Sequence, residues 1–371
     1  MPALVLTACV ALIVLCFGLK KPAYNWDMIG YVAAALSAEG YHGADLNTVT
    51  YDSLRSEVNA STFDLLVTQG EYRQTVYRDP LSLAQQLPFY RIRVLYIGLI
   101  RMAHATGLSY PRSTYVVSAV FAALSVMLLG LLGHETGAPA VAVPVVVAFS
   151  GFLDIASLST PDALACFFSL LTVYALIRGS MLVFVLAALL PSIRTDLLLL
   201  SLLVLGHAFI FGHKKYALAS MAVTLMLYWL IVRCNGAYGW LTLFNTSLIH
   251  KTAYPATLVP SRAIGDYLRP YGSMAYRFTM QPQMVIYGLA LWFLMRNGRR
   301  THPSDRRLLG AIFIIPMAFV AIHLLLFPAN TYRFFTFAAS LTAIGLIGQM
   351  RLVASASTDH RFKRRWLDPR P

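Results

Sequence analysis

Few side chains in this chain could do chemistry, and the first is a carboxylate beside an aromatic ring. Asp27 stands in the sequence Asn-Trp-Asp-Met-Ile-Gly-Tyr at residues 25–31, directly after an apolar run. A carboxylate held at a membrane boundary can accept a proton from an acceptor hydroxyl. The same residue also suits a helix start, because Asp favours the N-cap position. Asp27 is therefore either a general base or a helix cap.

A second carboxylate precedes another apolar run. Asp162 ends the sequence Ser-Thr-Pro-Asp at residues 159–162. Proline near a first helical turn, together with Ser, Thr and Asp, is typical of a helix start. In the functional interpretation, Asp162 instead faces the same outer cavity as Asp27. That placement requires the chain to be broken at Arg194.

Arg194 lies inside otherwise apolar sequence, in Ser-Ile-Arg-Thr-Asp at residues 192–196. Ionisable residues within membrane segments are costly and are functional-site candidates. A guanidinium group also suits bidentate contacts to phosphate. An internal pair between Arg194 and Asp196 is the structural alternative.

Further arginines lie next to apolar runs on the predicted outer side, where positive charge is not expected. Arg333 opens the last apolar run, and Arg91 and Arg93 precede another one. Each either extends to the membrane surface or is held by an anionic lipid head group or pyrophosphate. Several outer arginines that converge would form an anion-binding cavity.

The elements that must position these residues are membrane helices. Of the 371 residues, 58% are hydrophobic and 12% charged, with mean hydropathy +0.63, whereas about a quarter of an average soluble domain is charged. The net charge of +14 falls in short clusters between apolar runs, as expected for cytoplasmic membrane loops. Composition therefore predicts an all-α membrane protein with membrane lipids, and no nucleic acid, as partners.

About ten transmembrane helices are predicted, since one crossing needs roughly 20 apolar residues. The main apolar runs are 3–19, 113–133, 160–177, 216–232, 308–327 and 331–350, with shorter runs at 138–153 and 283–295. The run 3–19 lacks a signal-peptide cleavage site and is predicted to be a retained helix. Residues 94–106 either cross or lie in the interface, and 181–211 is correspondingly one crossing or two. Either combination gives ten.

Orientation follows from the basic loops at 213–215, 296–307 and 361–365, which should be cytoplasmic. Both termini are then cytoplasmic. Residues 1–350 form a single membrane domain, with a first outer loop at 20–112, a second at 234–282, and a basic tail at 351–371. Short interfacial helices are predicted in the first loop at 28–38 and 62–69.

In the order of these features, the chain resembles the glycosyltransferase C superfamily of polytopic membrane enzymes. The matching elements are Trp26 and Asp27 with Tyr31 after the first helix, a long first outer loop, Pro-Phe-Tyr at 88–90, Thr-Pro-Asp at 160–162, the break at Arg194, and Tyr-Arg-Phe at 332–334. The resemblance implies a metal-independent, cofactor-free inverting transfer from a polyprenyl-phosphate-linked sugar donor to a lipid, glycan or protein acceptor. It also implies the bacterial inner membrane, with the active site on the extracytoplasmic face.

The resemblance assigns roles to particular residues. Asp27 is the expected general base. The expected donor phosphate-binding residues are Arg333, Arg194, Arg91 and Arg93. The expected substrate-binding residues are Asp162, Trp26, Tyr31, Tyr90 and Tyr332.

Three alternatives remain open. A polymerase or ligase of lipid-linked glycans would share most of these features. A membrane acyltransferase would be favoured by a histidine inside a span with a polar neighbour, for which His207 and His323 are the candidates. A secondary transporter would be favoured by internal repeats with paired broken helices, and the sequence has only one broken region.

Overall fold

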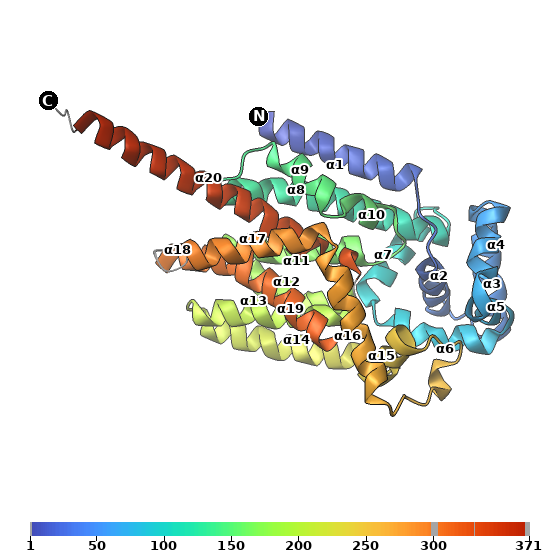
Figure 1. Ribbon diagram of the computed structural model, residues 1–371. Coiled ribbons are helices and arrows are strands. Elements are labelled where there is room, and N and C mark those ends of the chain that lie inside the picture. Colours follow the sequence, from blue (N-terminus) through green and yellow to red (C-terminus); the bar gives the residue numbers. More distant parts are fainter. Residues whose placement is uncertain (1, 298–302, 330, 368–371) are drawn as a thin grey trace.

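The computed structural model describes residues 2–297, 303–329 and 331–367, which form helices and loops without strands (Figure 1). Five stretches in these ranges are long and apolar enough to cross a membrane: Pro2–Lys20, Tyr110–Thr136, Lys214–Cys234, Arg306–Leu326 and Tyr332–Leu352. The protein is therefore an all-α integral membrane protein, as composition predicts.

The helices fall into a loop layer and a bundle. The loop layer consists of α2 (Asp27–Ser37), α3 (Gly43–Glu57), α4 (Ala60–Thr68), α5 (Gly70–Arg78) and α6 (Pro80–Arg91). The bundle begins with α1 (Pro2–Lys20), α7 (Val94–Ala105), α8 (Tyr110–Thr136), α9 (Ala142–Phe149), α10 (Phe152–Ser157) and α11 (Asp162–Ile177). The short helices predicted at 28–38 and 62–69 are present as α2 and α4.

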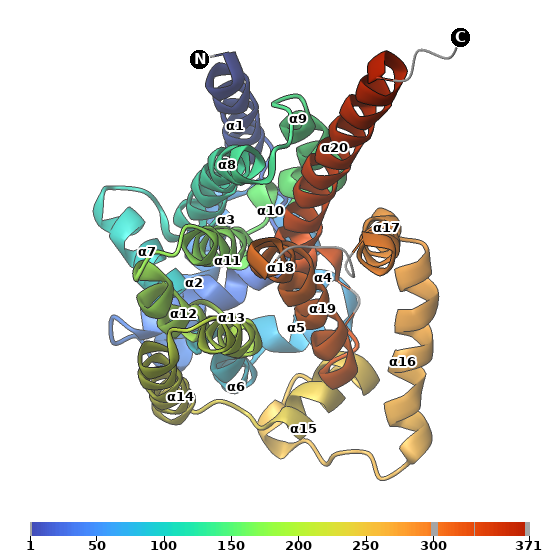
Figure 2. The ribbon, with the colours of Figure 1, turned by 90° about the vertical axis from the view of Figure 1, so that its left-hand side faces the viewer.

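The bundle continues to the end of the described chain. Its later helices are α12 (Leu182–Ile193), η1 (Thr195–Leu197), α13 (Leu198–Ile210), α14 (Lys214–Cys234), α17 (Pro282–Asn297), α18 (Pro303–Leu309), η5 (Gly310–Ile314), α19 (Ile315–Leu326), η6 (Tyr332–Phe335) and α20 (Thr336–Leu367). Between α14 and α17 lie α15 (Trp240–Phe244), η2 (Asn245–Ile249), η3 (Pro255–Thr257) and α16 (Ile264–Thr279). Figure 2 shows α16 and α17 beyond α19, on the side away from α13 and α14.

Residues 181–211 form two helices with a polar break between them. Arg194 has an extended backbone between α12 and α13. The Ser201 hydroxyl donates to the Ala187 carbonyl at 2.7 Å, so the two helices pack along each other. The structure therefore divides this apolar run at the charged residues, as one of the two sequence interpretations requires.

Two predicted element boundaries differ from the structure. The run 138–153 is divided into α9 and α10, because Gly151 adopts a left-handed conformation with φ +85° that favours glycine. The last helix does not end near residue 350 but continues as α20 through Leu367. The predicted tail is therefore largely helical, and its residues 368–371 lie outside the described residues.

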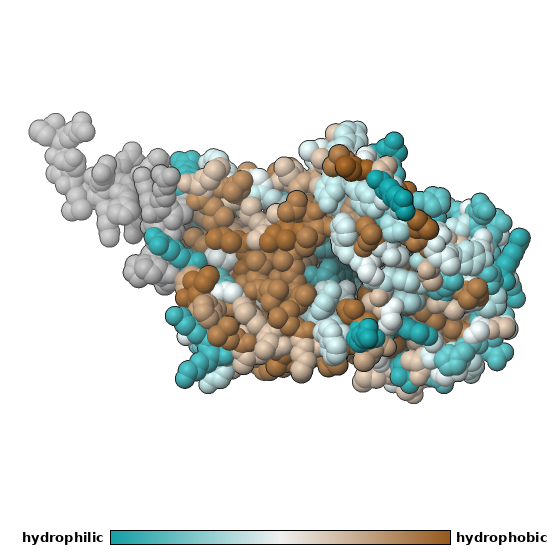
Figure 3. Space-filling model, turned by 90° about the horizontal axis from the view of Figure 1, so that it is seen from below, coloured by the Kyte–Doolittle hydropathy of each residue, from teal (hydrophilic) through white to brown (hydrophobic). Residues whose placement is uncertain are grey.

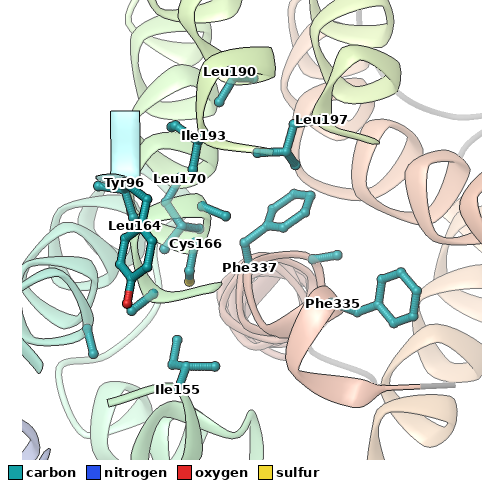
Figure 4. Packing of buried hydrophobic residues seen from close by; sticks show 14 of the residues in the cluster. Tyr96, Ile155, Leu164, Cys166, Leu170, Leu190, Ile193, Leu197, Phe335 and Phe337 are labelled. Atoms are coloured by element: carbon teal, nitrogen blue, oxygen red, sulfur yellow. The ribbon is translucent and has the colours of Figure 1, made fainter. Parts of the chain in front are cut away.

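Close helix packing forms the core of the bundle. A side chain at Gly18 of α1 would place its Cβ 2.5 Å from the Ala156 carbonyl oxygen of α10, so only glycine allows this approach. Small residues serve membrane helix packing in this way. Figure 4 shows Tyr96, Leu164, Ile193 and Phe337 among the buried side chains where α7, α11, α12 and α20 meet.

The two ends of the molecule differ in charge and in chain content. At one end, Arg307 donates to the Leu176 carbonyl at 3.2 Å, near His213, which precedes α14. The basic loop 296–307 lies at this end, although its residues 298–302 are outside the described residues. The loop layer lies at the opposite end (Figure 1). Apolar residues cover the bundle surface between them (Figure 3).

One buried carboxylate ties the loop layer to the bundle. The side chain of Glu57, at the end of α3, accepts hydrogen bonds from the hydroxyls of Ser109 at 2.6 Å and Tyr115 at 2.9 Å. It also forms an ion pair with Arg112 at 3.0 Å. The loop layer is thus fixed to the start of α8, which places Asp27 over the bundle.

Candidate active-site cavity

A cavity of about 1230 Å³ lies between the loop layer and the bundle. It is lined by residues of α2, α6, η1, α13, α14, α15, α16, α19 and η6. Figure 3 shows a hollow where the apolar surface of the bundle meets the hydrophilic surface of the loop layer. The volume exceeds that of typical small-ligand pockets, which hold roughly 300–1,000 Å³.

Asp27 is the first residue of α2 and lines this cavity. Its carboxylate accepts hydrogen bonds from Arg333 Nη2 at 3.2 Å, Asn25 Nδ2 at 3.3 Å and the Tyr90 hydroxyl at 3.4 Å. These distances are longer than those of strong charge-assisted hydrogen bonds. The side chain is 32% exposed, so its oxygens are accessible from the cavity.

Arg333 joins this carboxylate to a second one. Its Nε lies 3.2 Å from Asp162 Oδ2, while its Nη2 contacts Asp27. The short helix η6 turns Arg333 toward the two aspartates just before α20 begins. The side chain therefore points at partners inside the protein and does not extend to a membrane surface.

Arg194 is enclosed by carboxylates and an aromatic ring. Its Nη1 donates to Asp162 Oδ1 at 2.5 Å, and its Nε and Nη2 donate to Asp196 at 3.1 and 2.8 Å. Its guanidinium carbon lies 4.0 Å from the centroid of Phe334. The side chain is only 7% exposed. The internal Arg194–Asp196 pair is thus present and extends to Asp162, so Arg194 positions both aspartates.

Each aspartate is the first residue of its helix, and neither is the N-cap. Trp26 and Pro161 occupy the N-cap positions of α2 and α11, and neither side chain accepts a capping hydrogen bond. Asp162 is 3% exposed and also accepts a hydrogen bond from the Thr160 hydroxyl at 2.8 Å. The two carboxylates belong to an alternating series of charges that runs through the cavity wall.

Aromatic residues hold the Asp27 side of the cavity. Tyr31 packs edge-on against Tyr90, with ring centroids 5.0 Å apart. A Cβ at Gly30 would lie 2.3 Å from the Tyr90 ring, so this approach requires glycine. Trp26, Tyr31, Tyr90 and Arg93 line the cavity, and Arg93 Nε is buried without a hydrogen-bond partner. An unpartnered buried donor of this kind is available to an anion.

Two predicted site residues lie elsewhere. Arg91 donates to the Ser37 hydroxyl, and the Tyr332 hydroxyl donates to Asp154 at 2.7 Å. Neither residue lines the cavity. The remaining predicted residues converge there: Asp27, Asp162, Arg93, Arg194, Arg333, Trp26, Tyr31 and Tyr90.

Several cavity residues carried no local signal in the sequence. Lys251 of the second outer loop, Tyr72 of α5 and Gln86 of α6 also line the cavity. His323 also lines it, with Nδ1 3.4 Å from Asp196 Oδ2. His323 was a sequence candidate only for acyl transfer, and Lys251 lies in a polar loop without a motif.

Cationic groups outnumber carboxylates in the cavity lining. Its aspartates are Asp27, Asp162 and Asp196, whereas its cationic residues are Arg93, Arg194, Lys251, Arg269, Arg277 and Arg333. Because the surplus is positive, the cavity favours anionic ligands. Among the described residues, no group of three or more His, Cys, Asp or Glu side chains is arranged to hold a metal ion.

Comparisons with protein-family models, with curated proteins and with solved structures found no match for this chain. The function is therefore inferred from the geometry of the cavity and from the order of the sequence motifs.

Proposed function

We propose that the protein is a membrane glycosyltransferase that moves a sugar from a polyprenyl-phosphate-linked donor to a hydroxyl acceptor on the extracytoplasmic face. One observation carries the proposal: an accessible, loosely held carboxylate, Asp27, stands in a large cavity with surplus positive charge. The order of motifs that resembles the glycosyltransferase C superfamily supports the same reaction.

In the proposed reaction, the charged residues of the cavity have separate roles. Asp27 accepts the proton of the acceptor hydroxyl, and the oxygen then forms a bond to the anomeric carbon of the donor. The bond from that carbon to the phosphate oxygen breaks, and its electron pair leaves with the lipid phosphate. Attack opposite the leaving group inverts the anomeric centre. Arg333 and Arg93 stabilise the negative charge of the leaving phosphate, because preorganised donors act strongly in such sites.

The ten-crossing topology completes the proposal. In it, the crossings are α1, α8, α9 with α10, α11, α12, α13, α14, α17, α18 to α19, and α20, while α7 lies in the interface. Both termini and the basic loops are cytoplasmic, in the bacterial inner membrane. This arrangement agrees with the positive-inside tendency and leaves the cavity on the outer side.

The donor's hydrocarbon chain has an apolar path into the cavity. Leu198, Leu199 and Leu202 of α13 line one part of the wall, with Tyr228 and Val232 of α14. Further apolar side chains, such as Met226 and Trp229, are exposed on the surface of α14. A prenyl chain beside these helices would leave its phosphate in the cavity.

Membrane acyl transfer is a second candidate, favoured by His323. This histidine lies in the apolar helix α19, contacts Asp196, and has a buried Nε2 without a hydrogen-bond partner. A His323→Ala variant separates the two functions. Acyl transfer by a histidine base would be abolished, whereas sugar transfer by Asp27 would continue.

The direct test is product analysis with purified protein in liposomes. Polyprenyl-phosphate sugars of opposite anomeric configuration are supplied with membrane glycolipid acceptors, and the product linkage is determined by NMR. We expect transfer with inversion. Retention of configuration, or acyl transfer from a phospholipid or acyl thioester without sugar transfer, would refute the proposal.

A further inference from the structure

A segment of the second outer loop is docked on α6 of the loop layer. In this docking segment (residues 250–257), the Ala253 carbonyl accepts hydrogen bonds from Ser82 Oγ at 2.7 Å and Gln86 Nε2 at 3.0 Å. The Tyr254 hydroxyl donates to Asp79 Oδ2 at 2.6 Å. The segment's position is therefore set by side chains of α6 and its N-cap.

The docking brings Lys251 over an aromatic ring beside Asp27. The Lys251 ammonium lies 4.2 Å from the Tyr72 ring centroid. The Tyr72 hydroxyl donates to Gln86 Oε1 at 3.0 Å, so Gln86 holds the ring and the docking segment together. Gln86 is 4% exposed, and such a buried, satisfied amide fixes its neighbours in place.

Tyr72 and Trp26 form an aromatic surface on the same wall. Their ring centroids lie 5.6 Å apart, and both residues line the cavity. Arg73 supports this surface, with its guanidinium carbon 5.1 Å from the Trp26 ring centroid and Nη1 donating to the Leu65 carbonyl. Aromatic side chains offer an apolar face with a polar edge, which suits a pyranose ring.

Lys251 is a second cationic centre near Asp27, separate from Arg333. Arg333 approaches Asp27 from the bundle, whereas Lys251 approaches from the docking segment. None of the ion pairs formed by the described residues involves Lys251. Partial desolvation and the positive charge of Arg73 lower the pKa of Lys251, and Asp27 opposes this change.

Inverting transfer assigns these two centres to different substrates. The attacking hydroxyl and the leaving phosphate must lie on opposite sides of the anomeric carbon. If Arg333 holds the phosphate, the acceptor occupies the Asp27 side that faces Trp26, Tyr72 and Lys251. An acceptor without charge would leave the ammonium group of Lys251 without an anionic partner there.

We propose that Trp26, Tyr72 and Lys251 form the acceptor subsite, and that the acceptor is a sugar bearing an anionic group, a phosphate or a carboxylate. This inference rests on the proposed glycosyltransferase function. The aromatic surface takes the sugar ring, and Lys251 pairs with the anionic substituent.

The test uses full-length protein in liposomes with pairs of acceptor glycolipids that differ only in one phosphate or carboxylate. We expect Lys251→Ala to raise KM for the anionic acceptor about tenfold while KM for the donor changes less than twofold. Lys251→Arg should restore most of the affinity. Lys20→Ala, at an exposed lysine at the end of α1, is the matched control and should change neither constant.

Other outcomes overturn the inference. A rise in donor KM would mean that Lys251 binds the leaving phosphate, and equal losses with neutral and anionic acceptors would mean that it only supports the fold. Binding is also measured without turnover, by tryptophan fluorescence with glucose 6-phosphate and glucose. Tighter binding of glucose 6-phosphate that depends on Lys251 supports the subsite even if no donor reacts, and equal binding of both probes contradicts it. Absence of sugar transfer from every donor would refute the proposed function separately.

Discussion

The two sides of the cavity hold their charges very differently. On the bundle side, Asp162, Arg194 and Asp196 are tightly paired, with contacts of 2.5 to 3.1 Å and side chains of Asp162 and Arg194 almost fully buried. On the loop-layer side, Asp27 has only contacts of 3.2 to 3.4 Å and Lys251 has an aromatic ring as its partner.

This difference distinguishes residues that stabilise the fold from residues that react with substrates. A buried charge whose partners are all supplied by the protein is stabilised in one place and has little capacity left for a substrate. A carboxylate whose hydrogen bonds are long can replace one of them with a hydrogen bond from a substrate hydroxyl at a small cost in free energy. The bundle side should therefore govern stability, and the loop-layer side should govern catalysis and acceptor choice.

The largest effect on stability is expected at Arg194. Arg194→Met would leave Asp162 and Asp196 without their shared cation, and breaking a buried pair costs about 3–5 kcal/mol. Thermal unfolding in detergent should show a strongly destabilised or poorly inserted protein. A variant with wild-type stability and selective loss of donor use would instead make Arg194 a phosphate ligand.

Arg333 should affect turnover more than folding. Arg333→Ala removes a positive charge beside Asp27, and loss of one charge-stabilising donor typically costs roughly 10²–10³ in turnover. Single-turnover transfer and unfolding temperature are measured on the same preparation. Parallel losses of protein abundance and activity would place Arg333 with the supporting residues of the bundle side.

A substitution at Gly30 tests whether the Asp27 side of the cavity depends on close contact between the α2 backbone and the Tyr90 ring. Gly30→Ala would place a methyl group against the Tyr90 ring, and such overpacking costs about 1–3 kcal/mol. We expect lower stability together with reduced turnover, because Tyr90 also contacts Asp27. Gly98→Ala is the control, since no atom lies within 4 Å of a Cβ built there.

The smallest effect is expected from low pH on the stability of the docked state of the docking segment. Hydrogen bonds from the Tyr254 hydroxyl and the Leu81 backbone amide lower the pKa of Asp79. The docked state therefore gains stability above the ordinary Asp pKa of about 3.9, and loses it as pH falls through the lower docked value. After correction for the intrinsic exchange rate at each pH, hydrogen-exchange protection in residues 250–257 should be lower at pH 3 than at pH 5. In Asp79→Asn, the corrected protection should be the same at both pH values.

Local sequence predicted the helices better than it predicted the contacts between residues far apart in the chain. Apolar runs and turn residues near Asp27 and Asp162 are local signals, and they placed α2, α4, α11 and the break at Arg194. The ion pair between Asp27 and Arg333 joins residues 306 positions apart, a separation at which helical periodicity carries no information. Lys251 depends in the same way on docking between two loops.

The lack of long-range information in local sequence also explains why Arg91 and Arg93 could not be told apart. Arg91 ends α6 and Arg93 precedes α7, yet the two arginines have similar neighbours in sequence. The Arg91 side chain donates to Ser37, whereas Arg93, in the turn between α6 and α7, lines the cavity. This turn and the packing of α6 against α2 decide which arginine faces the site.

Single-turnover kinetics tests whether Asp27 is the general base. Single-turnover sugar transfer is compared for wild type, Asp27→Asn and the exposed-site control Asp64→Asn, in liposomes with matched amounts of inserted protein. General base catalysis contributes typically 10²–10⁴ in rate. We predict at least a hundredfold loss for Asp27→Asn, with donor binding and unfolding temperature unchanged, and no loss for Asp64→Asn. Near-normal turnover of correctly inserted Asp27→Asn protein would show that Asp27 is not the general base.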